Sequence, residues 1–117
     1  MNLMTRLFGT PVPVVDATEL REKLTGAKAP YLLDVRQPEE YHVGHIAGAT
    51  LIPLGELETR LGELPKDREI ACICASGSRS VAAARKLMAA GYTASSLTGG
   101  MMIWQRANLP VKTGSVR

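Results

Sequence analysis

Cysteine and histidine are scarce in this chain of 117 residues, which contains two of each. Cys72 and Cys74 lie two positions apart on an expected strand, where a disulfide between them would require severe distortion of the backbone. We therefore expect two free thiols, as is typical of a reducing compartment. His42 and His45 come without a second pair of metal ligands, so we expect neither a metal nor another cofactor.

Long apolar runs and a strong charge imbalance are also absent. Apolar residues make up 45% of the chain, charged residues 21%, and the net charge is +3 with scattered basic residues. This composition predicts a globular protein with neither a membrane nor a nucleic-acid partner. The first fifteen residues hold an apolar stretch broken by Gly9, Pro11 and Pro13, which is unlike a signal peptide, and we expect a cytoplasmic protein.

Short apolar runs alternate with helical patterns along the chain. Asp16, with Glu19 three positions later, has the pattern of a helix capping box, and Pro38 suits the first turn of a second helix. Leucines at helical spacing between residues 54 and 64 and an alanine-rich segment before Gly91 indicate further helices. Apolar segments that suit strands or strand-like runs lie at residues 14–15, 31–36, 49–52, 70–74 and 92–97.

This alternation predicts an α/β fold with about five mainly parallel strands and helices on both faces of the sheet. The length suits one domain, residues 1–117, with a core at about 12–111 and short tails. Sites in such sheets lie at the carboxyl ends of the strands. Cys74 is at the end of one.

The residues after Cys74 indicate a reactive sulfur. CASGSRS, residues 74–80, joins the expected strand to the helix that follows it, so the sulfur would face loop N–H groups and a helix N-terminus. Lowering a thiol pKa from about 8.5 by two needs roughly 2.7 kcal/mol, more than a helix dipole supplies. We expect converging loop N–H groups and the charge of Arg79 to supply the difference.

The other loop residues suit an anion site. Gly77 tolerates the positive φ that lets the backbone curl around an anion, and Ser76, Ser78 and Ser80 can donate hydroxyl hydrogen bonds or cap the helix. Such a loop can hold a thiolate, or a persulfide anion one sulfur longer. The alternative interpretation of Cys74 is a small buried apolar side chain, and that interpretation holds for Cys72.

Other polar and small residues have more than one interpretation. Asp34 and Arg36 at the end of a strand are acid and base candidates, but a structural ion pair is favoured. Gly99 and Gly100 either approach the site or form a tight turn. Trp104 is expected in the core or in a pocket wall.

Three segments resemble the rhodanese-like family, and specifically its small single-domain members. CASGSRS resembles the active-site loop, and DVRQPEEYHVGHIAGATLIPL, residues 34–54, resembles an upstream signature. TGGMMIWQRANLPV, residues 98–111, is similar to the C-terminal segment of the family. The resemblance spans about residues 12–111 and implies a rhodanese-like fold.

The resemblance implies a sulfurtransferase of the thiosulfate sulfurtransferase type. Cys74 would take sulfane sulfur from thiosulfate or a persulfide donor, become a persulfide, and pass the sulfur to cyanide or a thiol. Asp34 and Arg36 would support the site. Thiosulfate is in question, because some thiosulfate-using members have a basic residue where Ala75 stands. The implied substrate-binding residues are those of the loop: Ala75, Ser76, Gly77, Ser78, Arg79 and Ser80.

Other functions stay open at this point. A cysteine phosphatase or arsenate reductase would use a similar loop, but its loop is one residue longer than the four-residue spacing between Cys74 and Arg79. A regulatory interaction module would not need Cys74. A sulfur relay to a partner protein would keep the persulfide and change only the acceptor.

Overall fold

The computed structural model describes residue 3 and residues 9–114. Within them, five strands form one sheet in the order β1-β5-β4-β2-β3, and every neighbouring pair is parallel. The parallel α/β sheet predicted from the sequence is therefore confirmed. The strands are β1 (Val14–Val15), β2 (Tyr31–Asp34), β3 (Thr50–Leu51), β4 (Ile70–Ile73) and β5 (Ala94–Leu97).

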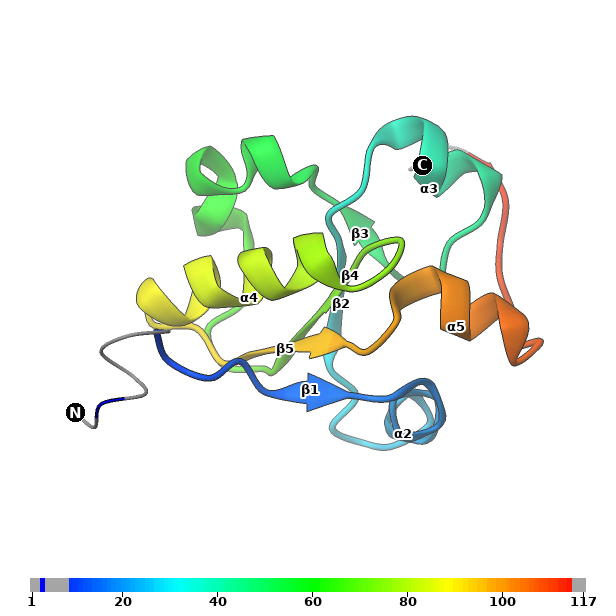
Figure 1. Ribbon diagram of the computed structural model, residues 1–117, viewed down its shortest axis with the longest axis horizontal. Coiled ribbons are helices and arrows are strands. Elements are labelled where there is room, and N and C mark those ends of the chain that lie inside the picture. The colour runs from blue at the N-terminus through cyan, green and yellow to red at the C-terminus, as the bar shows by residue number, and fades with distance from the viewer. Residues whose placement is uncertain (1–2, 4–8, 115–117) are drawn as a thin grey trace.

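Helices lie on both faces of this sheet. Figure 1 shows α4 and the two 3-10 helices on one side of the strands and α2 on the other. The helix α5 packs with α2: Trp104 of α5 and Leu20 of α2 belong to the same buried cluster. The helices are α2 (Ala17–Leu24), α3 (Pro38–Val43), η1 (Leu54–Glu56), η2 (Glu58–Glu63), α4 (Ser78–Ala89) and α5 (Gly100–Arg106).

Local sequence signals explain where most helices begin and end. The Asp16 carboxylate accepts the Glu19 N–H at 2.8 Å, and the Glu19 carboxylate accepts the Asp16 N–H, so the predicted capping box is present. Pro38 begins α3, and Gly91 follows α4 with a φ of +91°. These boundaries agree with the predictions.

The segment from residue 54 to 64 differs from its predicted α-helix. It forms the two short 3-10 helices η1 and η2. Gly55 and Gly62 lower its helix propensity, and Pro53 and Pro65 flank it. The spacing of its leucines, which is three residues at two of the three steps, also suits a helix of three residues per turn.

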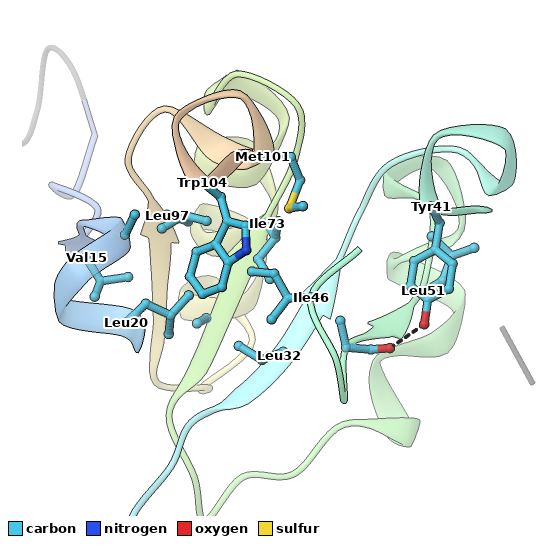
Figure 2. Packing of buried hydrophobic residues seen from close by; sticks show 13 residues of the cluster. Val15, Leu20, Leu32, Tyr41, Ile46, Leu51, Ile73, Leu97, Met101 and Trp104 are labelled. Atoms are coloured by element: carbon cyan, nitrogen blue, oxygen red, sulfur yellow. Dashed lines mark hydrogen bonds between the residues drawn. The ribbon is translucent and has the colours of Figure 1, made fainter. Parts of the chain in front are cut away.

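Alternation along β4 divides the core into two layers. Ala71 and Ile73 face the cluster that contains Leu20 and Trp104, and Figure 2 shows the Trp104 indole among Leu20, Leu97 and Ile73. Ile70 and Cys72 face the opposite cluster with α4, and Cys74 joins that layer. The predicted core position of Trp104 is confirmed.

A buried ion pair joins β2 to the segment after α3. Asp34 accepts hydrogen bonds from the Arg36 Nε at 2.9 Å and Nη2 at 2.8 Å, and the same Nη2 donates to the Gly44 carbonyl oxygen at 2.8 Å. Asp34 is fully buried and Arg36 is 5% exposed. The pair has the structural role that was favoured for it.

The predictions about the membrane, the signal peptide and the cytoplasm concern where the protein is located in the cell. In the described part of the chain, no helix has both the length and the apolar character that crossing a membrane requires. The signal-peptide prediction concerns the first fifteen residues, of which 1–2 and 4–8 lie outside the described residues. The cytoplasmic location stays a prediction.

Replacing Arg36 with methionine should destabilise the protein by about 3–5 kcal/mol, because Asp34 would be left as a buried charge without its partner. Urea unfolding followed by circular dichroism measures the loss. Arg60→Met is the control, since Arg60 also pairs with carboxylates but does so at the surface. Equal midpoints for the two variants would contradict the importance of the buried pair.

Candidate active site

Cys74 lies directly after β4, at the carboxyl end of a central strand of the sheet. Cys74 is fully buried, and its side chain belongs to the layer between the sheet and α4. Figure 1 shows the loop that follows β4 at one end of the sheet, between α3 and α5. This is the edge at which parallel α/β sheets bind their ligands.

The loop turns its backbone toward the sulfur. The Gly77 N–H donates to the Cys74 Sγ at 3.0 Å, and the Ser80 Oγ lies 3.4 Å from the same atom. Gly77 has a φ of +112°, a left-handed conformation that glycine adopts without steric strain. The predicted curl of the loop at Gly77 is therefore what aims its N–H at the sulfur.

The surroundings of Cys74 favour its thiolate. Burial raises the pKa of this thiol, but hydrogen bonds from the Ser80 hydroxyl and from the N–H groups of Ser80, Gly77 and Ser76 outweigh burial and lower the pKa overall. Cys72 has the opposite behaviour, since burial and the neighbouring Cys74 raise its pKa to about 12. Both thiols are free, and of the two Cys74 is the one whose surroundings favour the reactive thiolate form.

The N-terminus of α5 fixes the other side of the loop. The Met101 N–H donates to the Cys74 carbonyl oxygen at 2.8 Å, and the Met102 N–H donates to that of Ala75 at 3.0 Å. Gly100 has a φ of +56°, and a Cβ there would collide with the Cys74 carbonyl oxygen. Of the two interpretations of Gly99 and Gly100, close approach to the site is therefore the one observed for Gly100.

Arg79 has a hydrogen-bonded carboxylate partner in a neighbouring helix. Its guanidinium donates to both carboxylate oxygens of Glu40 in α3, at 2.7 and 2.8 Å. This hydrogen-bonded arginine holds the pKa of Glu40 at about 2, so the pair is charged at neutral pH. The short distance from α4 to α3 gives the guanidinium this bidentate partner. The hydrogen bonds to Glu40 raise the pKa of Arg79, and the charge of Cys74 raises it further, so the arginine and the sulfur interact. The expected help of Arg79 to the thiolate stays a prediction.

The three loop serines contribute unequally. Ser76 and Ser78 are exposed, and the hydroxyl that lies near the sulfur is that of the buried Ser80. Ser96 in β5 was not among the predicted site residues, yet its Oγ lies 2.7 Å from the Ser80 Oγ. The parallel register of β4 and β5 pairs Ser96 with Cys72, and this register could not be read from the sequence.

His45 contacts a neighbouring aromatic residue. His45 stacks on the Tyr41 ring and its Nδ1 lies 2.8 Å from the Tyr41 carbonyl oxygen. Among the residues described by the structure, no three His, Cys, Asp or Glu side chains gather as metal ligands would.

The site thus consists of a loop at the carboxyl edge of a parallel α/β sheet, whose N–H groups can stabilise a thiolate. The family model of the rhodanese-like domain matches residues 16–107. The chain therefore belongs to the rhodanese-like family, as its three sequence segments suggested.

Named relatives agree with this assignment. A sulfurtransferase of Allochromatium vinosum is 36% identical over 83% of this chain and 92% of its own length. The putative sulfur carrier protein YrkF of Bacillus subtilis is 41% identical over 69% of this chain, which spans only 44% of that protein. The crystal structure of a rhodanese-related protein from Thermoplasma volcanium has a TM-score of 0.81 and 35% identity, and covers 86% of this chain and 97% of its own.

The lowered pKa of Cys74 predicts a pH-dependent contribution to stability. Above the usual thiol pKa the folded and unfolded chains both carry a thiolate, and the folded one gains the full stabilisation; this gain is lost as the pH falls through the lowered pKa. The free energy of unfolding of the wild type, minus that of Cys74→Ser, should therefore rise with pH between these two values.

Urea unfolding under a reductant at a series of pH values measures this difference. Cys72 is present in both proteins, so its own titration cancels to first order. A difference that stays flat or falls with pH over that interval would show that the folded protein does not favour the Cys74 thiolate.

Proposed function

We propose that this chain is a sulfurtransferase in which Cys74 carries sulfane sulfur as a persulfide. The observation that carries the proposal is that the buried Cys74 sulfur accepts a hydrogen bond from the Gly77 N–H and has the Ser80 hydroxyl group 3.4 Å away, where it can donate to the thiolate. These groups stabilise the Cys74 thiolate, which is the nucleophile that takes up the sulfur.

The reaction has two displacements. The Cys74 thiolate attacks the outer sulfur of the donor, so a new S–S bond forms while the donor's S–S bond breaks, and the donor leaves with the electron pair as sulfite or a thiolate. A thiolate or cyanide then attacks the outer sulfur of the persulfide. The Cys74 Sγ leaves as the thiolate, which restores the starting state.

The charges around the loop favour a persulfide over thiosulfate as the donor. Thiosulfate is a dianion, and Arg79, the loop's one cation, is already bound to both oxygens of Glu40. Ala75 adds no positive charge at its position. A donor with less negative charge therefore loses less in approaching this site.

A thiol of a partner protein is the acceptor that the site suits best, with cyanide or a small thiol as the alternative. Met102 is 48% exposed and Ile103 is 42% exposed, and both lie at the start of α5 beside the loop. Apolar side chains at this position can contact a protein surface while the persulfide is attacked. The sulfur-carrier name of YrkF supports a relay of this kind.

Sulfur loading tests the proposal directly. The reduced protein, incubated with a low-molecular-weight persulfide or with thiosulfate and examined by intact mass, should gain one sulfur that cyanide removes. Cys74→Ser should gain none, and Cys72→Ser should behave as the wild type because burial and the neighbouring Cys74 raise the pKa of the Cys72 thiol to about 12. No gain from either donor, or a gain that survives Cys74→Ser, would refute it. Hydrolysis of an aryl phosphate that depends on Cys74 would indicate a phosphatase instead.

Glu40→Gln should improve thiosulfate as a donor. Glutamine can still accept from Arg79, but it no longer neutralises the arginine charge, so kcat/KM for thiosulfate should rise roughly fivefold, equivalent to about 1 kcal/mol. The value for a persulfide donor, which carries one negative charge on its sulfur rather than two, should rise less. Steady-state kinetics at low and high salt measures both, and added salt should diminish the gain.

Glu39→Gln is the matched control, because Glu39 is the neighbouring carboxylate and is exposed. If both variants raise the thiosulfate value equally, the cause is the general field of the surface rather than the Glu40 to Arg79 pair. A lower value for Glu40→Gln would mean that the ion pair helps thiosulfate to react.

A further inference from the structure

Ser96 presents a second hydroxyl behind the one that meets the sulfur. It lies in β5, paired in register with Cys72, and its Oγ is 2.7 Å from the Ser80 Oγ. Both serines are buried, with 1% and 0% of their surface exposed. The three groups thus form a buried line from Ser96 through Ser80 to Cys74.

Counting protons shows why the direction of this line matters. Ser80 has one hydroxyl proton and three neighbours: the Cys74 Sγ at 3.4 Å, the Gly77 carbonyl oxygen at 3.1 Å and the Ser96 Oγ. If Ser80 donates to Ser96, no hydroxyl proton remains for the sulfur. If Ser96 donates to Ser80, the Ser80 proton can go either to the Gly77 carbonyl oxygen, to which it donates beside a protonated Cys74, or to the sulfur once Cys74 is a thiolate.

Ser96 has a reason to be the donor. Among the described residues, the Ser80 hydroxyl is the partner recorded for the Ser96 hydroxyl, and a buried donor without an acceptor is costly. When Cys74 is a thiolate, its charge attracts the Ser80 proton, and Ser96 can then supply its own proton to the Ser80 oxygen. Each proton stays on its own oxygen throughout.

We infer that Ser96 is a positioning residue, which donates to Ser80 so that the Ser80 hydroxyl points at the Cys74 thiolate. This inference rests on the proposed function only in that Cys74 reacts as a thiolate. When the outer sulfur is attached, the charge moves away from the Sγ, and the Ser80 proton turns to the Gly77 carbonyl oxygen. Ser96 thus serves the nucleophile without touching it.

Ser95 provides a matched control one residue away. It is equally buried, at 2% exposure, and its hydroxyl has no hydrogen-bond partner among the described residues. It points to the opposite face of β5, because side chains alternate along a strand. Ser95→Ala and Ser96→Ala therefore remove the same atom from the same strand, and only the second breaks the line to the sulfur.

The pH dependence of Cys74 alkylation tests the inference. The reduced protein is treated with iodoacetamide, and intact mass follows the rate for the wild type and for Ser95→Ala, Ser96→Ala, Ser80→Ala and the double variant Ser80→Ala/Ser96→Ala. Below the midpoint of the wild-type profile, Ser96→Ala should react about three- to tenfold more slowly, because less thiolate is present. Ser95→Ala should match the wild type.

The double variant tests whether Ser96 acts through Ser80. In the Ser80→Ala background, the loss of Ser96 should slow alkylation no further. Ser96→Thr keeps a hydroxyl and should restore the wild-type profile, which guards against a folding defect in Ser96→Ala. Equal profiles for Ser95→Ala and Ser96→Ala, or a full Ser96 effect without Ser80, would overturn the inference. Alkylation needs no sulfur donor, so these outcomes are independent of whether the protein transfers sulfur.

Discussion

The hydrogen bond from the Gly77 N–H to the Cys74 sulfur depends on the whole end of the sheet. The left-handed turn at Gly77 aims the N–H, and the N–H groups of Met101 and Met102 hold the carbonyl oxygens of Cys74 and Ala75 in place. The fold therefore supplies the loop with support from β4 on one side and from α5 on the other. Without both, the donors would not converge on one atom.

The charged groups near the loop are arranged in pairs. The groups that hydrogen-bond the Cys74 sulfur are neutral N–H and O–H groups. Arg36 is bound to Asp34 and Arg79 to Glu40, so each nearby guanidinium has its own carboxylate. A site of this kind stabilises a compact sulfur anion through N–H and O–H groups and gives less attraction to a substrate with two negative charges. This is why we propose a persulfide rather than thiosulfate as the sulfur donor.

Local sequence signals predicted the strands, most of the helices and the loop after Cys74, whereas they could not predict contacts between distant segments. The capping box at Asp16, the strands and the loop at Cys74 each follow from a short stretch of neighbouring residues. The pairing of Arg79 with Glu40 joins residues 39 positions apart, and the contact of Ser80 with Ser96 joins residues 16 apart. Both depend on which helices and strands become neighbours. For that reason the local signals could not predict Glu40 as the partner of Arg79, and they missed Ser96.

A crystal structure of the protein after treatment with a persulfide donor tests the central claim most directly. The account predicts one additional sulfur on Cys74, lying inside the loop and accepting hydrogen bonds from backbone N–H groups of residues 76–80. An additional sulfur that points into solvent without those bonds would contradict it. So would a modified Cys72 beside an unmodified Cys74.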